Sequence, residues 1–333
     1  MKKSDGFALV LVLWVLSLLT IMAGSFALSM RREAAIVNGG STNAQAMAVA
    51  ESGIAVAELM LLNLDPLQRW RTDGSVYQID YTDAKVRIRI MSESGKIDIN
   101  VADQILLQAL IGSTSLEEDA QTKLVDAILD WRDADDLVRT EGAEKAEYKK
   151  EGLRYQPRNK PFQSIEELQL VLGMNEEVFK KIENLITVNS GKPKVDMTQA
   201  TPEVLQLLPG TDSELIKSYI AAKMDSLKSG LPVPAFDAFG ASQMGGSNTP
   251  TIPTLPVVAG LDQNITVTVI AEALLNDETT AIIKALIKKS DGTGSSPFQA
   301  LKWLRNAIGE GSLFTDEKEE LLVRQYDEPE FNN

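Results

Sequence analysis

One uncharged stretch constrains this chain more than any other feature. Residues 7–30 read FALVLVLWVLSLLTIMAGSFALSM and contain no Asp, Glu, Lys or Arg. A helix rises about 1.5 Å per residue, so this stretch would span roughly 36 Å, enough to cross a hydrocarbon core of about 30 Å. Lys2 and Lys3 precede it, and Arg31 and Arg32 follow it. The sequence therefore predicts a membrane-spanning helix at the N-terminus.

A cleaved secretory signal is the alternative interpretation of this stretch. Such a signal has a shorter apolar core, with small residues at a cleavage site beyond it. The small residues at 23–25 and 27–29 match such a site only weakly. The apolar run also continues without a turn signal into residues 31–64, where apolar residues recur at helical spacing. These features favour one long helix, with a weak point at the two glycines of residues 39–40.

The short basic leader, the Gly6–Phe7 junction and the apolar helix resemble the class III signal of type IV pilins and type II secretion pseudopilins. The resemblance implies that a prepilin peptidase cuts after Gly6 and that Phe7 becomes the N-methylated first residue. It also implies a single-pass anchor in the bacterial inner membrane, with the rest of the chain in the periplasm. The same helix would later pack into the core of a filament.

Leu11 departs from the common pattern of that family, in which the fifth residue of the mature chain is glutamate. A carboxylate in an apolar helix is costly unless it meets a cation, which in pilins is taken to be the neighbour's N-terminal amine. A subunit with Leu11 avoids that cost but cannot pair with a subunit above it. It therefore suits the topmost position of a filament. In this respect the chain resembles the GspK family (general secretion pathway protein K) of minor pseudopilins.

Length and composition agree with this resemblance. The chain has 333 residues, more than a pilin-like subunit needs, so an additional domain is expected. Its net charge of −14 argues against a nucleic-acid or anionic-membrane surface. Cysteine is absent from the sequence, which excludes disulfides and thiol chemistry. Histidine is also absent, which removes the commonest general base and the commonest zinc ligand.

The expected fold class is α+β: a type IV pilin-like fold, in which a long N-terminal helix packs on a small antiparallel sheet, with a large inserted helical domain. Alternating apolar residues predict two strands within 75–91, and a later hairpin at 265–270 and 280–287. Residues 298–304 fit either a strand or a short helix. The predicted organisation is a leader (1–6), a transmembrane helix (7–30), the periplasmic helix with the first strands (31–94), the inserted helical domain (95–228), a Pro/Gly-rich loop (229–260), the closing strands (261–309) and a loosely ordered acidic tail (310–333).

The inserted segment contains a repeated phrase. Residues 96–102 read KIDINVA and residues 194–200 read KVDMTQA, and each precedes a short predicted helix. These pieces resemble helix-hairpin-helix units, which grip DNA phosphates through backbone amides at a glycine-rich hairpin. Here the hairpin at 209–212 lacks the second glycine, and Asp212 and Glu214 place negative charge where a phosphate would lie. We therefore expect a structural or partner-binding role and no nucleic acid.

Carboxylates are concentrated between the two copies of the phrase. Eight acidic residues fall within 130–151. Clustered carboxylates repel one another unless a cation or solvent screens them, and hard oxygen ligands suit Ca²⁺. The spacing is not that of an EF-hand, because counting from Asp133 puts Leu137 and Val138 where a ligand and the obligatory glycine should lie. On composition alone, a solvated acidic loop remains the alternative.

The order of residues in this segment is similar to a phrase of the tip pseudopilin family. It reads Asp-Trp-Arg-Asp-Ala-Asp-Asp at 130–136, Gly-Ala-Glu at 142–144 and Pro-Arg-Asn-Lys-Pro-Phe at 157–162. The resemblance implies a structural calcium ion here, which could tie down a long loop that no disulfide can staple. The candidate ligands carried over by position are Asp133, Asp135, Asp136, Glu144 and Glu147.

The resemblance implies a non-enzymatic subunit at the tip of the type II secretion pseudopilus, which initiates filament assembly and supports protein export across the outer membrane. The implied partners are other minor pseudopilins, the inner-membrane secretion platform and the prepilin peptidase, with secreted substrates or the secretin as further contacts. One alternative is a type IV pilus or DNA-uptake minor pilin that contacts nucleic acid. Another is a membrane-anchored hydrolase using the acidic cluster with a metal, for which the sequence offers no nucleophile elbow, phosphate loop or zinc motif.

Overall fold

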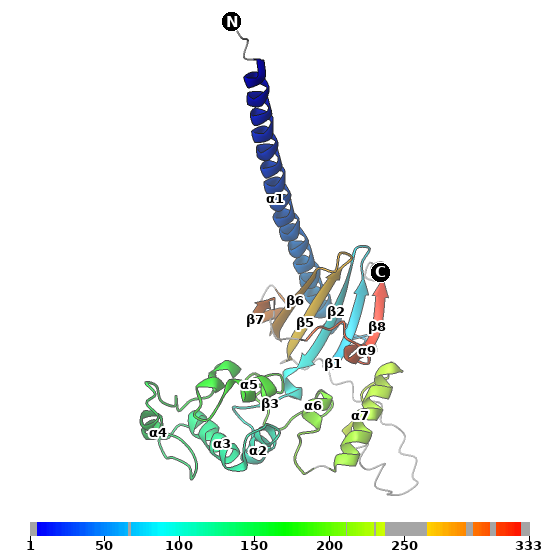
Figure 1. The fold of residues 1–333 in the computed structure, drawn as a ribbon. Helices are drawn as coiled ribbons and strands as arrows, with labels where there is room; N and C mark the ends of the chain where they lie inside the picture. Colours follow the sequence, from blue (N-terminus) through cyan, green and yellow to red (C-terminus); the bar gives the residue numbers. More distant parts are fainter. Residues whose placement is uncertain are drawn as a thin grey trace.

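The computed structural model describes residues 5–65, 68–210, 212–229, 231–236, 265–290, 296–306 and 311–327. Figure 1 shows three parts: a long helix, a sheet against the lower half of that helix, and a helical insert beyond the sheet. The free end of the helix and the insert therefore lie at opposite ends of the molecule. Most of the predicted loop at 229–260 lies outside the described residues.

The long helix α1 spans Asp5–Leu61 without a break, so the glycines at 39–40 do not interrupt it as the sequence suggested. Its first half is apolar and exposed, and within the described residues it is the one helix long and apolar enough to cross a membrane. From Ala46 onward one side of the helix is buried against the sheet. The helix predicted from the uncharged stretch is therefore present, and its lower half continues as an ordinary packed helix.

The sheet has six strands in the order β7-β6-β5-β2-β1-β8. The strand bounds are Asp73–Asp80 (β1), Ala84–Ser92 (β2), Thr266–Leu275 (β5), Thr280–Lys289 (β6), Phe298–Arg305 (β7) and Leu322–Asp327 (β8). The chain leaves the sheet after Ser92 and returns at β5, where Ser92 pairs with Val267. The two ends of the long insertion therefore lie side by side, which is why the sheet accommodates it.

The C-terminal segment differs from the expectation. We expected an acidic, loosely ordered tail from residue 310, but residues 316–319 form helix α9 and residues 322–327 form β8. Strand β8 pairs with β1 in the parallel direction, so the sheet is antiparallel at every pairing except this one. Residues 298–304, which fitted a strand or a helix, lie in strand β7.

Buried charges hold the C-terminal segment against the sheet. The Arg87 guanidinium donates to the Leu313 carbonyl (2.9 Å) and to Glu319 Oε2 (2.6 Å). On the neighbouring strand, Glu272 is the cross-strand partner of Arg87 and accepts from the Ser312 hydroxyl at 2.9 Å. Each buried charge thus finds its partners in a segment far away in sequence.

Small residues let α1 lie close to the sheet. Gly53 faces β2 and β5, and a Cβ at this position would lie 2.9 Å from Val86 Cγ2 and 3.2 Å from the Ala271 Cβ. Ala50 and Ala57, one turn away on either side, are fully buried. Together with Ile54, Leu61 and the apolar faces of the strands, these residues form the core between helix and sheet.

The insert has its own apolar core, centred on α3 and including Leu107, Leu124, Trp131 and Tyr148. Its elements are η1 (Glu93–Gly95), β3 (Ile97–Asp98), α2 (Gln104–Gly112), α3 (Glu118–Arg132), α4 (Lys145–Lys150), η2 (Ile165–Leu170), α5 (Glu176–Ile182), β4 (Ile186–Thr187), α6 (Pro202–Leu205) and α7 (Ser213–Lys228).

The two repeated phrases form the same turn. In each copy an aspartate, Asp98 or Asp196, accepts the amide two residues later on its Oδ1 atom, at 3.0 and 3.1 Å. In each copy its carbonyl accepts the amide four residues later, at 2.8 and 2.9 Å. The sequence repeat is therefore a structural repeat, and each copy ends where a short helix begins.

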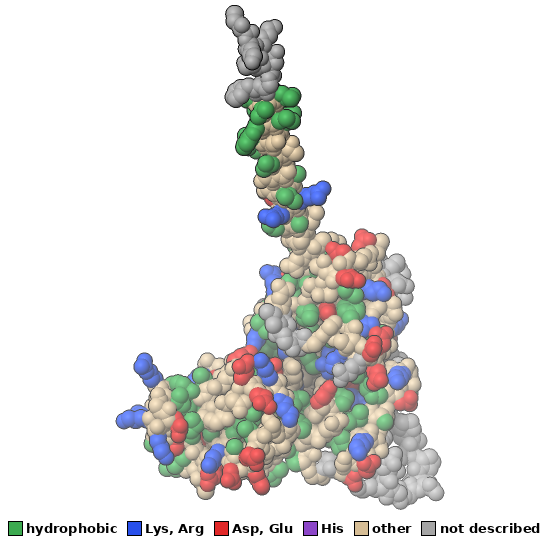
Figure 2. Space-filling model, viewed as in Figure 1, with side chains coloured by type: hydrophobic (Ala, Val, Ile, Leu, Met, Phe, Trp, Pro, Cys, Tyr) green, Lys and Arg blue, Asp and Glu red, His purple; other side chains and the backbone are tan. Residues whose placement is uncertain are grey.

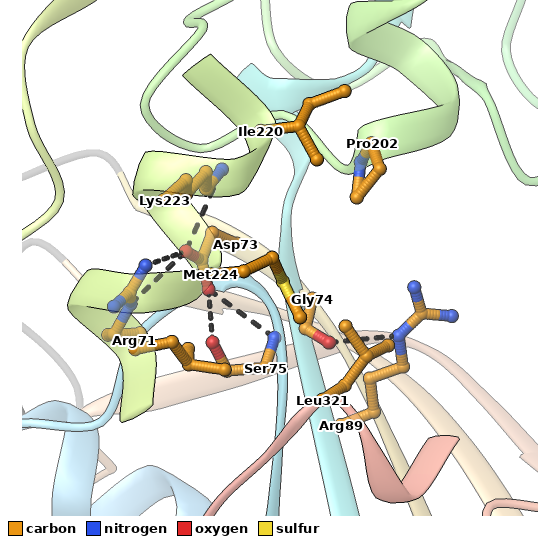
Figure 3. A pocket seen from close by; sticks show the side chains of 11 residues that line it. Arg71, Asp73, Gly74, Ser75, Arg89, Pro202, Ile220, Lys223, Met224 and Leu321 are labelled. Atoms are coloured by element: carbon orange, nitrogen blue, oxygen red, sulfur yellow. Dashed lines mark hydrogen bonds and ion pairs between the residues drawn. The ribbon is translucent and has the colours of Figure 1, made fainter. Parts of the chain in front are cut away.

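Two buried polar clusters join the insert to the sheet. In the first, shown in Figure 3, Asp73 of β1 accepts from Arg71 and Ser75 and lies 3.6 Å from Lys223 Nζ of α7. Lys223 also donates to the Ala200 carbonyl at 2.6 Å. Burial lowers the pKa of Lys223 to about 8. Burial alone would raise the pKa of Asp73, but the charges of Lys223 and Arg71 lower it, so the aspartate is ionised at neutral pH.

The second cluster surrounds Glu93, at the point where the chain leaves β2. Glu93 Oε1 accepts from Lys96 Nζ and from the Thr268 hydroxyl of β5, both at 2.7 Å. Its other oxygen accepts from the Thr187 hydroxyl of β4. One carboxylate therefore ties the sheet to β4 and to Lys96, the residue before β3, and the insert is attached at two separate places.

Filling the space at Gly53 should loosen the helix from the sheet. We expect Gly53→Val to lower the free energy of unfolding by about 1–3 kcal/mol, because the added atoms overlap Val86 and Ala271. Gly40→Ala is the control, since a Cβ at Gly40 meets nothing within 4 Å and alanine favours helix. Urea unfolding of the full chain in detergent micelles measures both. Equal stability of the two variants would contradict the close approach.

Removing the charge of Asp73 should destabilise the junction shown in Figure 3. Asp73→Asn leaves Lys223 and Arg71 buried without their counter-charge, a change that costs about 3–5 kcal/mol in comparable buried pairs. Asp83→Asn, in the exposed turn between β1 and β2, is the matched control. Urea unfolding should show a large loss for the first variant only, and similar curves for both would contradict this role.

Candidate functional site

The acidic segment predicted from the sequence begins on the buried side of α3. Asp126 and Asp130 lie one helical turn apart, and Asp130 is fully buried. Asp126 Oδ2 accepts the Glu141 amide and Asp130 Oδ2 accepts the Arg139 amide, each at 3.2 Å. A Cβ on Gly142 would overlap the Asp130 carboxylate, so glycine is required there. The two aspartates thus hold the returning loop against the helix.

Three carboxylates in this loop have buried oxygens without a hydrogen-bond donor. Among the described residues, the buried side-chain atoms that have no hydrogen-bond partner are Asp130 Oδ1, Asp133 Oδ1 and Glu144 Oε1. Arg139 supplies the nearby positive charge: its Nε lies 3.1 Å from Asp130 Oδ1 as an ion pair, and its Nη2 donates to Asp133 Oδ2 at 3.1 Å. One guanidinium therefore pairs with two of these three carboxylates, Asp130 and Asp133.

The pKa values of Glu144 and Asp130 reflect their burial among more carboxylates than cations. Burial, together with the negative charges of Asp130, Asp133, Asp136 and Asp135, raises the pKa of Glu144 to about 7. Burial likewise raises the pKa of Asp130, and the charge of Asp133 adds to the effect. The loop therefore holds more negative charge than its own cation neutralises.

The five ligand candidates fall into two groups. Asp133 and Glu144 carry the unpartnered buried oxygens described above. Asp135 Oδ1 accepts the Leu137 amide (2.9 Å), Asp136 Oδ1 accepts Asn159 Nδ2 (2.8 Å), and Glu147 Oε2 accepts the Glu144 amide (3.0 Å) as part of the cap of α4. Within the described part of the chain, no three such side chains already stand in a metal-binding arrangement. The ligand set therefore stays a prediction.

Asp130 is the residue that the sequence-based ligand set omitted. The sequence contained an indication of this residue: Asp126 and Asp130 are spaced i, i+4 among apolar residues of α3, next to the buried Trp131. Buried carboxylate oxygens without donors are the hard ligands that Ca²⁺ takes, and a divalent cation would supply the missing positive charge. The chemistry of the site fits such an ion, and Asp130, Asp133 and Glu144 are the residues that could hold it.

The helix-hairpin-helix resemblance has a clear structural outcome. Asp212 caps α7 and accepts the amides of Glu214 (2.7 Å) and Leu215 (3.4 Å). Asp103 does the same for α2 and Asn175 for α5, at 2.8 and 2.9 Å. The amides that would grip a phosphate are therefore already occupied by the chain's own side chains.

The residues predicted to act in processing and assembly lie in α1. Gly6 and Phe7 belong to its first turn, and the structure does not describe their side chains. Leu11 lies on the uncovered apolar part of the helix, where its side chain is 53% exposed. Figure 2 shows apolar side chains along this part of α1 and the first cationic side chains below it.

Comparison with known proteins adds a family and a fold. Residues 62–191 match the family model of the type II secretion system (T2SS) protein K. The type II secretion system protein K of Aeromonas hydrophila is 27% identical over 236 residues, covering 62% of this chain and 70% of the relative. The protein of the same name from Pseudomonas aeruginosa is 24% identical over 247 residues, covering 67% and 73%.

A solved structure has the same fold. It is the GspK-GspI-GspJ complex of the type 2 secretion system of enterotoxigenic Escherichia coli, in which one chain aligns with 81% of this chain and 98% of its own length. The TM-score is 0.51 and the sequence identity 17%, so the likeness concerns the fold. The expected combination of long helix, small sheet and helical insert is thereby confirmed.

Calcium should stabilise the acidic loop by binding the three buried carboxylate oxygens that accept no hydrogen bond. At a calcium concentration 100-fold above Kd, a site present only in the folded chain would stabilise it by about 2.7 kcal/mol. We expect thermal melting of the full chain in micelles to show this rise over a chelator-treated sample, and Asp130→Asn or Glu144→Gln to lose most of it. Glu141→Gln, on the exposed part of the loop, is the matched control.

Isothermal calorimetry separates binding from stabilisation in the same samples. Heat of calcium binding in the wild type and the Glu141→Gln variant, and little in the other two, is the expected pattern. An identical calcium response of wild type and Asp130→Asn would remove Asp130 from the site.

Proposed function

Because this chain belongs to the type II secretion system protein K family, we propose that it is a non-enzymatic minor pseudopilin at the tip of the type II secretion pseudopilus. The observation that carries the proposal is the placement of two features at opposite ends of one molecule. A bare apolar helix forms one end, and a bulky helical insert forms the other (Figure 1).

The apolar half of α1 supports a single-pass anchor. The side chains of this half have no cover from the rest of the described chain, and a hydrocarbon environment would remove them from water. We assign this segment to the inner membrane, with the sheet and the insert in the periplasm. Cleavage after Gly6 by the prepilin peptidase and N-methylation of Phe7 complete the proposed maturation.

The insert supports the tip position. It extends sideways beyond the sheet, at the end of the molecule away from the membrane helix (Figure 2). A subunit with this shape leaves no room for an identical pilin-like domain to stack above it. Leu11 points to the same position, since it has no carboxylate to offer to the amine of a subunit above.

Other minor pseudopilins are the proposed partners. The solved complex of similar fold contains GspK together with GspI and GspJ. We propose that the counterparts of GspI and GspJ join this chain through the membrane and periplasmic parts of α1 and start the filament. The inner-membrane secretion platform is the proposed site of assembly, and secreted substrates or the secretin are further proposed contacts of the insert.

We propose a structural calcium ion in the acidic loop. Asp130, Asp133 and Glu144 would hold it through their buried oxygens that accept no hydrogen bond, of which Asp130 Oδ1 also lies in an ion pair with Arg139. Asp135, Asp136 and Glu147, the remaining candidates, would join only by giving up their present hydrogen bonds. When bound, the ion would neutralise the negative charge of the loop. It would also fix the start of α4, because Glu144 is the N-cap residue of that helix.

The alternative of a DNA-contacting minor pilin is not favoured by the family match or by the site. The first amides of α2, α5 and α7 are capped by the chain's own side chains, and the net charge is −14. Cations on a DNA-binding face are what give such proteins their affinity. A shift assay at low salt distinguishes the two functions, and we expect no shift.

Placing a carboxylate at position 11 tests the tip position. We expect Leu11→Glu to reduce secretion of a reporter protein by tenfold or more, because a carboxylate without a partner is costly in the apolar part of a membrane helix. Leu11→Ile, which keeps the position apolar, is the control. Co-purification of the other minor pseudopilins reports whether the complex forms. Normal secretion by the Leu11→Glu variant would contradict our account of this position.

A further inference from the structure

Helix α4 and the residues after it form a projection that contributes little to the fold. Within residues 145–156, Tyr148 is the fully buried side chain, where its ring packs beside Trp131 and its hydroxyl accepts the Leu172 amide at 2.9 Å. The helix ends at Lys150, and the positive φ of 75° at Gly152, two residues later, lets the chain turn back. Nearly all other side chains of the projection point to solvent.

Four exposed side chains of this projection are cations, against one exposed carboxylate, Glu151. Lys145, Lys149, Lys150 and Arg154 are exposed, and we call them, with the neighbouring Tyr155, the α4 surface. Among the ion pairs of the described residues, none involves these four cations. Residues 145–156 carry these four cations and two carboxylates, Glu147 and Glu151, so the projection is net positive in a chain whose net charge is −14.

The position of the α4 surface excludes the membrane that holds α1. Figure 1 places α4 in the insert, beyond the sheet, and Figure 2 shows cationic side chains at that end of the insert. The part of α1 between Met30 and Leu61 alone has a length of about 46 Å. Charge interactions in physiological salt decay over about 8 Å, so lipid headgroups around α1 do not attract these cations.

We propose that the α4 surface is a docking site for an acidic protein surface. Charge complementarity supports it: four cations without intramolecular partners attract carboxylates and speed encounter with them. Tyr155 adds an aromatic side chain that is 40% exposed beside Arg154, and tyrosine and arginine are enriched in protein interfaces. The inference rests on one part of the proposed function, the assignment of the apolar half of α1 to the membrane.

Direct binding tests the docking site with a defined probe. The probe is a fluorescent 20-residue peptide of alternating Glu and Tyr, titrated with the full chain in nanodiscs at 50 mM salt. We expect Lys149→Glu with Lys150→Glu to weaken binding at least tenfold. Lys123→Glu with Lys228→Glu, on exposed positions of α3 and α7, changes the net charge equally and should leave binding unchanged. Equal loss in both double variants, or no binding by the wild type, would overturn the proposal.

Vesicles provide the second arm of the binding test. Phosphatidylglycerol vesicles replace the peptide, with the full chain kept in nanodiscs of neutral lipid at the same 50 mM salt. Weaker binding to vesicles than to the peptide supports a protein partner. Tighter binding to vesicles that also depends on Lys149 and Lys150 would overturn it in favour of an opposing anionic membrane.

Secretion by cells separates this inference from the proposed function. We expect the Lys149→Glu, Lys150→Glu variant to co-purify with the other minor pseudopilins as the wild type does, yet to secrete a reporter at least fivefold less. If the wild type does not co-purify with the other minor pseudopilins, that result counts against the proposed function and not against the docking site. Thermal melting checks folding, and Lys149→Gln with Lys150→Gln repeats the test with a smaller change. Unchanged secretion by both variants would overturn the docking site.

Discussion

A single helix has to satisfy two different surroundings, and the rest of the molecule follows from how it does so. The first half of α1 offers only apolar side chains and has no protein around it, whereas the second half must lie tightly on a sheet. Gly53, between the buried Ala50 and Ala57, makes the second condition possible because any larger residue would meet Val86 and Ala271. The helix thereby joins a membrane-compatible segment to a water-soluble domain without a hinge between them.

The same logic extends to the insert. The chain leaves β2 and re-enters β5 at neighbouring positions, so the sheet closes as if the insert were absent. Free attachment at one point would let the insert swing, but Asp73 and Glu93 hold it through separate buried clusters. The insert is therefore held to the sheet at two places, and the sheet packs closely on the helix at Gly53. For a filament subunit, this makes the position of the insert a consequence of the position of α1.

The sequence predicted the elements whose signals are local. The uncharged stretch predicted α1, alternation predicted β1, β2, β5 and β6, and the repeated phrases predicted two equivalent turns. It did not predict β8, because the residues that hold the stretch leading into this strand, Arg87 and Glu272, are polar and lie far away in the chain. An acidic C-terminal composition resembles a solvated tail unless these buried partners are known.

The acidic loop shows a finer limit of the same kind. Composition indicates that carboxylates gather there, but it does not indicate which oxygens already have donors. Asp135, Asp136 and Glu147 accept hydrogen bonds on the oxygens described above. The buried Asp130 and Glu144 each have one oxygen that accepts no hydrogen bond. This distinction depends on the path of the loop after α3.

The tip position itself is tested most directly by locating the chain in assembled pseudopili. Because the sequence contains no cysteine, Lys123→Cys on the exposed side of α3 creates a unique attachment point for a gold label. Electron microscopy of purified, labelled filaments then counts the label and records its place. Our account predicts one label at one end of each filament. Labels distributed along the filament length would contradict it.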